Sequence, residues 1–143
     1  MTVEANLDAL RRWYGAYEAG GFEAGDALIE VIFDPQVEFS PWLAREVEQR
    51  TYRGHEGLRS FFRELEETLE GLRYDPPEYR PVGEDVIVVF TRLAGAPRHS
   101  AVPVGNDLGL VYEFRDGLVR RLTAFGSHEE ALQAAQELQR AQA

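Results

Sequence analysis

The feature that most constrains the fold is an Asp-Gly pair between two apolar-rich runs, LGLVYEFRDGLVRRLTAFG, over residues 108–126. Asp and Gly both tolerate the positive φ of a type I′ turn, so Asp116-Gly117 predicts the two-residue loop of a β-hairpin. A loop of this length sets the register of the two strands. Tyr112 should then lie opposite Arg121.

Side chains alternate along a strand, so the hairpin has two faces. One face should carry Leu108, Leu110, Tyr112, Phe114, Val119, Arg121, Thr123 and Phe125. The other should carry Val111, Glu113, Arg115, Leu118, Arg120, Leu122 and Ala124. Neither face is polar enough to be a solvent face. We therefore expect one to form a cavity wall and the other, through Val111, Leu122 and Ala124, to form a homodimer contact.

Length and charge limit the classes of function. The chain has 143 residues, which fits one domain over 1–143, and 44% of them are hydrophobic. Its formal net charge of -10 disfavours nucleic acid and anionic membranes as partners. There is no cysteine, and no apolar run reaches membrane-spanning length. The acidic N-terminus is unlike a signal peptide, so we expect a cytoplasmic protein.

Hydrophobic periodicity predicts the order of the elements. Helices are expected at 6–19, at 22–33, at 54–71 and from Ser127 onward, where SHEE is a capping box. Strands are expected at 36–42, 86–93, 99–104 and in the hairpin, with a loop at 44–53, an extended segment at 74–81 and a turn at 95–97. Helices at the front and strands at the back predict an α+β fold, with an antiparallel sheet and helices on one face.

Four segments, taken in this order, resemble the SnoaL-like branch of the nuclear transport factor 2-like superfamily. They are WYGAYEAG at 13–20, DPQVEF at 34–39, YRGHEGL at 52–58, and the hairpin at 112–126 followed by HEEAL. The resemblance covers nearly the whole chain. It implies a strongly curved, mostly antiparallel sheet wrapped into a cone, three N-terminal helices on the concave side, a short C-terminal helix, a ligand pocket in the cone, and a homodimer through the convex side.

The superfamily contains ketosteroid isomerases, polyketide cyclases, dehydratases and non-catalytic binders, so the resemblance does not by itself assign a function. Its isomerase branch uses a first-helix Tyr, a first-strand Asp and a hairpin Asp, and these positions fall near Trp13, Ser40 and Leu110. All three are substituted, so the steroid-isomerase mechanism does not carry over. Its ring cyclases use Asp or His in the cone, whereas Asp116 lies in the turn.

Four residues are candidates for acid–base catalysis: Glu38, His99, Tyr112 and Arg121. Glu38 is a buried base if its strand face turns inward and a solvent residue otherwise, and His99 could be in the pocket or exposed. Arg121 shares a face with Tyr112, so it needs a partner: either a carboxylate such as Glu38 or an anionic ligand. With Tyr112 it could stabilise a carboxylate or enolate oxygen.

Further residues are candidates for ligand binding, and several of them have a structural alternative. They are Trp13, Tyr17, Trp42, His55, Phe62, Phe90, Arg92 and Phe125. The aromatic residues could equally be core or loop contacts, His55 could serve the start of a helix, and Arg92 could pair with a carboxylate. His55, His99 and His128 lack metal-ligand spacing, so we expect neither a metal nor a cofactor.

The sequence therefore predicts a protein that binds a small, largely apolar molecule in the cone. It could be a cofactor-free isomerase, cyclase or dehydratase. The alternative is a non-catalytic binder or a dimeric partner domain. Two titratable groups with opposed pKa shifts inside the pocket would favour the enzyme.

Overall fold

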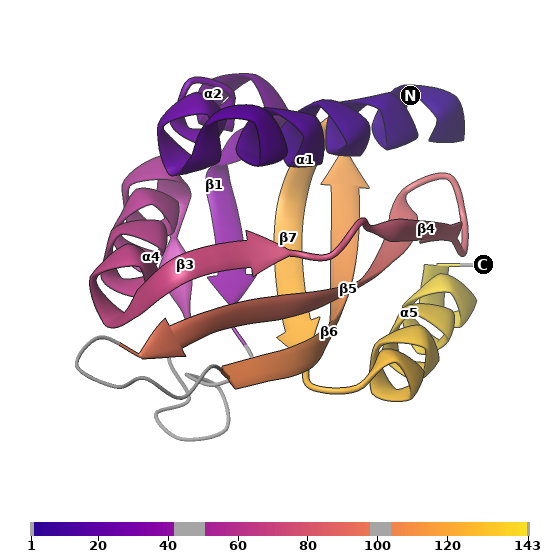
Figure 1. The fold of residues 1–143 in the computed structure, drawn as a ribbon. Coiled ribbons are helices and arrows are strands. Elements are labelled where there is room, and N and C mark those ends of the chain that lie inside the picture. Colours follow the sequence, from indigo (N-terminus) through magenta and orange to yellow (C-terminus); the bar gives the residue numbers. More distant parts are fainter. Residues whose placement is uncertain (1, 42–50, 98–103, 143) are drawn as a thin grey trace.

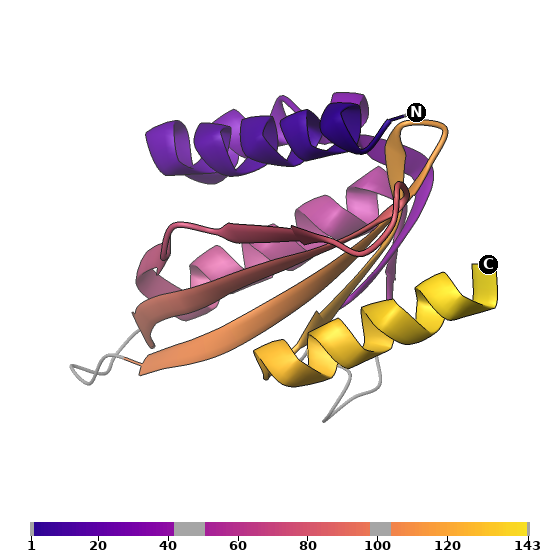
Figure 2. The same ribbon diagram turned by 90° about the vertical axis from the view of Figure 1, so that its right-hand side faces the viewer.

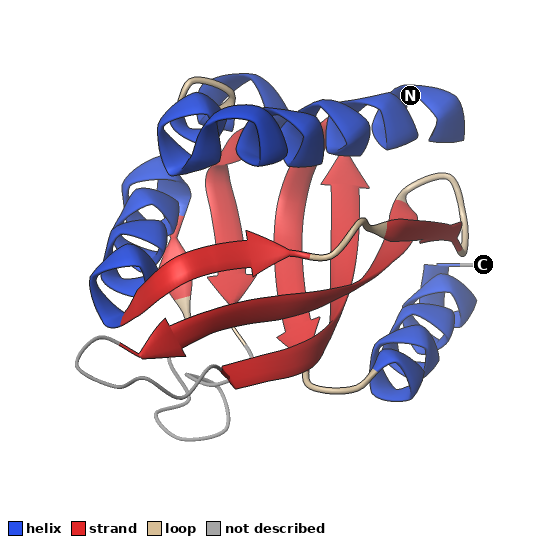
Figure 3. Cartoon of the chain, in the orientation of Figure 1, coloured by secondary structure: helices blue, strands red, loops and turns tan. Residues whose placement is uncertain are grey.

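The computed structural model describes residues 2–41, 51–97 and 104–142. Its strands form one mixed sheet in the order β2-β1-β7-β6-β5-β3, with β4 also paired to β5. The strands are β1 (Phe33–Ser40), β2 (Tyr52–Arg53), β3 (Leu69–Tyr74), β4 (Glu78–Pro81), β5 (Val86–Pro97), β6 (Val104–Arg115) and β7 (Leu118–Phe125). The helices are α1 (Val3–Asp26), α2 (Ile29–Ile32), α4 (Gly54–Thr68) and α5 (His128–Gln142). The fold class is α+β, as predicted (Figure 3).

The helices lie on both faces of the curved sheet. Helices α1, α2 and α4 cover the concave side (Figure 1), whereas α5 lies against the outer face (Figure 2). Two hydrophobic clusters result. The inner cluster includes Leu10, Trp13, Ile29, Phe33, Leu58, Ile87, Val89, Tyr112 and Leu122, and the outer cluster is built on Val86, Val88, Val111, Ala131 and Ala135. The expectation of helices on one face of the sheet is therefore wrong for the C-terminal helix.

Helix α5 approaches the sheet closely at Gly109. A Cβ at that position would collide with the side chain of Ala131, so glycine permits the contact. Ser127 begins the helix as predicted, because its Oγ accepts a hydrogen bond from the backbone N–H of Glu130 at 3.2 Å. Within the part of the chain that the structure describes, no helix is both long and apolar enough to cross a bilayer.

The hairpin turn is confirmed, but the register beyond it is not. Asp116 and Gly117 have φ values of 53° and 82°, as a type I′ turn requires. A β-bulge then shifts the pairing by one residue, so that Tyr112 lies opposite Leu122 and Glu113 opposite Arg121. The predicted Tyr112–Arg121 pair is therefore wrong.

The bulge exchanges the two faces of β7. Leu122 and Ala124 turn into the inner cluster, Phe125 joins the outer one, and the Arg121 side chain is 50% exposed. This arrangement keeps a guanidinium out of the apolar interior, where an unpaired charge is costly. Arg120, the extra residue, donates a hydrogen bond from Nη1 to the carbonyl of Gln36 on β1 at 2.6 Å.

The surface expected to make a homodimer is also changed. Helix α5 covers Val111, while Leu122 and Ala124 are buried on the other side of the sheet. These three residues therefore do not form one exposed face. Homodimer formation itself stays a prediction.

The N-terminal helices are divided differently from the expectation. Gly20-Gly21 bends the first helix instead of ending it: Gly21 has φ 68° and ψ -155°, and α1 continues to Asp26. The side chain of Thr2 caps α1, whereas Asn6, where the helix was expected to begin, is buried and donates from Nδ2 to the Glu84 carbonyl at 2.8 Å. The second predicted helix, at 22–33, is divided between the end of α1 and the short α2, and β1 already begins at Phe33, which pairs with β7.

Several other boundaries move because strands continue pairing beyond their apolar runs. The predicted turn at 95–97 belongs to β5, where Gly95 pairs with Val104 of β6. The segment at 74–81 contains the end of β3 and all of β4, and both strands pair with β5. The predicted helix at 54–71 ends at Thr68. Most of the predicted loop at 44–53 and strand at 99–104 lies outside the described residues.

We predict that Phe62→Ala lowers the free energy of unfolding by about 3 kcal/mol. The half-buried Phe62 ring lies 5.7 Å from the ring of Trp13 and 4.9 Å from that of Phe22, so its loss leaves α4 poorly packed against α1. Chemical denaturation measures the change. Val31, 52% exposed, provides the control, since Val31→Ala should cost less than about 0.5 kcal/mol. Equal effects of the two substitutions would contradict the predicted packing.

Candidate functional site

A pocket of about 680 Å³ opens between the second half of α1, the end of α4 and the segment around β3. Its wall is aromatic, and its edge carries charged residues and prolines. The lining residues are Tyr14, Tyr17, Glu18, Gly21, Phe22, Glu66, Leu69, Gly71, Arg73, Tyr74, Asp75, Pro76 and Pro77. Figure 1 shows the three elements that supply these residues, with α1 at the top, α4 at the left and β3 below α1.

The bend in α1 shapes one side of the pocket. Gly21 adopts a positive φ that favours glycine, and it redirects the helix so that Phe22 contacts Tyr17, their ring centroids 4.9 Å apart. The end of α1 also returns to the core: a Cβ on Gly25 would lie 3.4 Å from the ring of Trp13. One helix therefore supplies both a buried core segment and a pocket wall.

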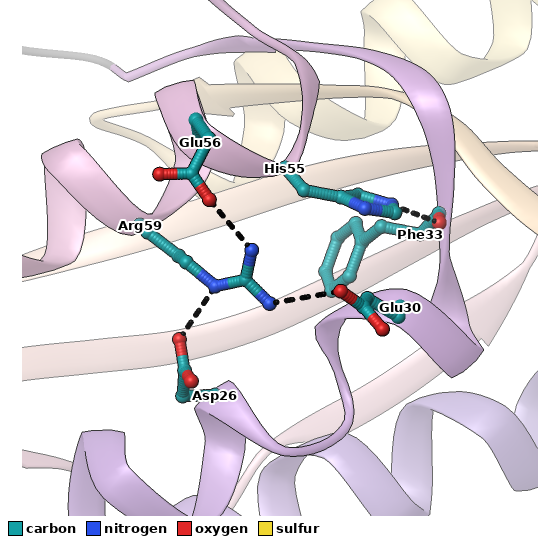
Figure 4. A network of polar contacts seen from close by, with 6 residues as sticks. All are labelled: Asp26, Glu30, Phe33, His55, Glu56 and Arg59. Carbon is teal, nitrogen blue, oxygen red and sulfur yellow. Dashed lines mark hydrogen bonds and ion pairs between the residues drawn. The ribbon is translucent and has the colours of Figure 1, made fainter.

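A network of ion pairs holds the end of α1 against α4 (Figure 4). From α4, Arg59 Nε lies 2.8 Å from an oxygen of Asp26, Arg59 Nη2 lies 3.6 Å from Glu30, and Arg59 Nη1 lies 2.9 Å from Glu56. Hydrogen bonds to Asp26 and Glu56 raise the pKa of Arg59. The network fixes the bent segment that carries Phe22.

Tyrosine side chains connect the pocket wall to the inner core. The hydroxyl oxygens of Tyr14 and Tyr112 are 2.7 Å apart, and either one can donate the hydrogen bond. Burial raises the pKa of both, and the hydrogen bond between them partly offsets the rise at Tyr112. Tyr74 packs edge-on against Tyr17 at 5.0 Å and against Tyr14 at 6.3 Å. The phenols therefore stay neutral and can act as hydrogen-bond donors.

The charged residues at the pocket come from three separate elements. Glu18 lies on α1, Glu66 on α4, and Arg73 and Asp75 at the end of β3 and just beyond it. The backbone of Asp75 is held by β5: its N–H donates to the Arg92 carbonyl at 2.9 Å, and its own carbonyl accepts from Thr91 Oγ1 at 2.7 Å. Burial and the negative charge of Glu66 raise the pKa of Tyr17.

The four predicted catalytic residues do not come together. Tyr112 is buried in the inner core beside Tyr14. Glu38 and Arg121 lie on the outer face of the sheet, with Arg121 Nε 3.5 Å from Glu38 Oε2. The carboxylate-partner interpretation of Arg121 is therefore correct, and its predicted place in the cone is wrong. His99 lies outside the described residues.

Glu38 and Arg121 belong to a row of alternating charges across four strands. Arg53 on β2, Glu38 on β1, Arg121 on β7 and Glu113 on β6 are successive neighbours in register. Arg53 Nη1 lies 2.8 Å from Glu38 Oε1, and Arg121 Nη1 lies 4.0 Å from Glu113 Oε2. Cross-strand pairs of this kind stabilise the sheet, so the row has a structural role.

Of the predicted ligand-binding residues, the structure places Tyr17 in the pocket wall. Trp13 is buried in the inner cluster and Phe62 packs against it, whereas Phe90 and Phe125 pack against the outer cluster. His55 donates from Nε2 to the Phe33 carbonyl at 2.7 Å, and Arg92 Nη1 lies 3.1 Å from Asp107. None of these six residues is among those that line the pocket. Trp42 lies outside the described residues.

Sequence reasoning missed most of the pocket. Tyr14, next to the position assigned to the isomerase tyrosine, is the first-helix tyrosine that lines it, and the helical spacing from Tyr14 to Tyr17 could have indicated this. Phe22 and Tyr74 were assigned to a second helix and to an extended segment. Among residues 2–41, 51–97 and 104–142, no three histidine or carboxylate side chains gather as a metal site would require.

We predict that Glu113 gives stability a specific pH dependence. Burial raises the pKa of its carboxyl, Arg121 opposes the rise, and Glu38 adds to it. Because the pKa of this carboxyl is higher in the folded than in the unfolded protein, its contribution to stability is fully present at a pH below its pKa in the unfolded state. That contribution is lost as the pH rises through its pKa in the folded state. Lowering the pH from about 7 to about 4 should therefore stabilise the native protein relative to Glu113→Gln.

Thermal unfolding midpoints of the two proteins at both pH values check this prediction. Glu67→Gln, an exposed change on α4, is the control and should leave the pH dependence unchanged. Arg121→Leu should strengthen the dependence, because it removes the cation that lowers the pKa of Glu113. A parallel pH response in native protein and Glu113→Gln would contradict the assignment.

The fold is shared with several solved structures. An NTF2-like protein of unknown function from Burkholderia pseudomallei has a TM-score of 0.71 at 17% identity, over 90% of this chain and 95% of that one. TerC, co-crystallized with polyporic acid, has a TM-score of 0.70 at 22% identity, over 93% and 98%. A ketosteroid isomerase-like protein from Catenulispora acidiphila, in complex with trimethylamine, has a TM-score of 0.67 at 11% identity, over 89% and 91%.

No curated protein is significantly similar to this sequence. The model of the SnoaL-like domain, in contrast, matches residues 10–122, which span α1 through most of β7. This stretch includes the bent first helix, the Tyr14–Tyr112 pair and every residue that lines the pocket. The chain therefore belongs to the SnoaL-like domain family and has its NTF2-like fold.

Proposed function

We propose that the protein binds a small, largely apolar molecule in the pocket between α1, α4 and β3. The observation that carries the proposal is a cavity of about 680 Å³ with Tyr14, Tyr17, Phe22 and Tyr74 in its wall. Small-molecule sites typically occupy roughly 300–1,000 Å³ and combine apolar walls with a few polar groups. The rings supply the apolar area, and the charged edge supplies orientation.

The solved structures support this proposal. TerC was co-crystallized with polyporic acid, and the Catenulispora acidiphila protein was solved in complex with trimethylamine. Both share the fold of this chain over most of their lengths. Proteins that share this fold were thus crystallized with different small molecules, so the residues of the wall rather than the fold are expected to decide which molecule binds.

We predict that Tyr17→Ala weakens binding of Prodan, a neutral naphthalene dye, by about tenfold, or ~1.4 kcal/mol. The substitution removes a ring that lines the pocket and contacts Tyr74. Titration of the dye, followed by its fluorescence, measures the affinity. Tyr79→Ala is the matched control, because Tyr79 is also half-buried and packs near Tyr14 but does not line the pocket. Equal weakening by both variants, or no binding to the native protein, would refute the proposal.

Acid–base catalysis is a second candidate function, and the Tyr14–Tyr112 hydrogen bond favours it. Removing a proton next to a carbonyl group leaves negative charge on the carbonyl oxygen. Tyr14 could donate a hydrogen bond to that oxygen while Tyr112 donates to Tyr14. Glu18 and Asp75 provide carboxylates at the same pocket that could accept the proton.

For this candidate we predict that the protein accelerates deuterium exchange at the methyl group of 2-acetylnaphthalene in D₂O, as followed by NMR. Tyr14→Phe should slow the exchange by about a hundredfold, the usual effect of losing one oxyanion donor. Tyr79→Phe, which removes a hydroxyl outside the pocket wall, should leave the rate unchanged. Exchange no faster than in buffer would leave the protein a non-catalytic binder.

A further inference from the structure

The charges and rings around the pocket define a narrower ligand class, an inference that rests on the proposed binding function. We propose that the pocket selects molecules in which a positively charged amino group is attached to an apolar body. Three acidic residues, Glu18, Glu66 and Asp75, line the cavity together with one arginine, Arg73. An ammonium group would be attracted there, and a carboxylate or phosphate would be repelled.

The carboxylates come from parts of the chain far apart in sequence. Glu18 lies on α1, Glu66 on α4, and Asp75 just after β3, so the fold gathers them around one cavity. Two backbone hydrogen bonds to β5 fix the position of Asp75. The negative charge of the site therefore belongs to the architecture of the pocket and adds to the formal charge of -10 on the whole chain.

The rings supply the second element of amine recognition. Tyr17 packs edge-on against both Phe22 and Tyr74, with ring centroids 4.9 and 5.0 Å away. Aromatic faces attract cations, and they also bury the apolar body of a ligand. Glu66 is near enough to Tyr17 for its charge to raise the pKa of the phenol, so ring and carboxylate belong to the same wall.

The arginines expected to hold an anion are elsewhere. Arg121 pairs with Glu38 on the outer face, and Arg92 pairs with Asp107. Neither residue lines the pocket. The cation selectivity proposed here therefore replaces the earlier expectation of an anionic ligand held by an arginine.

Three probes that share one apolar body test the inference: 1-naphthylmethylammonium, 1-naphthylmethanol and 1-naphthoate. Isothermal titration at neutral pH and low salt should show the ammonium binding about tenfold more tightly than the alcohol, with the carboxylate weakest. Raising the salt concentration to about 0.5 M should reduce the preference for the ammonium, because the pocket is open to solvent.

Variants locate the source of the preference. Glu18→Gln and Asp75→Asn should each weaken ammonium binding about threefold more than they weaken alcohol binding. Glu78→Gln, an exposed change on β4 outside the pocket wall, is the matched control and should have no effect. Circular dichroism verifies folding, and either pocket variant suffices if the other fails to fold.

The outcomes separate this inference from the proposed function. If ammonium and alcohol bind equally, or if Glu78→Gln acts as strongly as the pocket variants, the cation selectivity is refuted while binding of an apolar molecule stands. If none of the three probes binds, both proposals fail. Tighter binding of the naphthoate than of the alcohol would also overturn the inference.

Discussion

The structure depends above all on the long antiparallel pairing of β5 with β6, which runs from Val86 opposite Glu113 to Gly95 opposite Val104. Alternate side chains of this pair enter opposite cores. Ile87, Val89 and Tyr112 pack beneath α1, whereas Val86, Val88 and Val111 pack against α5. Because a strand has a two-residue period, one continuous apolar run can serve both layers. Strand β3 beside the pocket and the terminal helix α5 both take their positions from this two-sided strand pair.

The sequence indicated the class of fold and the position of most elements, and the reasons are local. Asp-Gly favours one turn geometry, a capping box begins one kind of element, and an apolar run such as VIVVF needs cover on both faces. Gly20-Gly21 was harder to interpret, because glycine is compatible with either the end of a helix or a bend in it. The helix bends and continues because its last turn, around Gly25, packs against Trp13. These two residues are twelve positions apart, so no short-range sequence pattern contains the contact. The family resemblance was correct because it rested on the order of several loose motifs.

The candidate site was less predictable, for two physical reasons. A single bulged residue reversed the face of Arg121, and neither register was excluded by the local pattern of residues 118–125. The pocket wall also comes from segments that carry no motif: the far side of a helix bend, the end of α4, and the short strand β3 with the prolines that follow it. Tyr17 was identified because its helical spacing placed it near other rings. Tyr14 was overlooked beside Trp13, although its hydroxyl makes the buried contact with Tyr112.

The position of the pocket outside the two cores has an evolutionary consequence. Of its lining side chains, Tyr14 is buried and Tyr74 packs against the inner cluster, while most of the others lie at the edge of the structure. Substitutions in such a wall change shape and charge at little cost to folding, since surface changes rarely alter stability much. The two-sided sheet can thus be inherited nearly intact while the wall diverges. Proteins at 11–22% identity that share the fold therefore need not share a ligand. The wall is the part of this chain in which substitutions that favour a new ligand would cost the least folding stability.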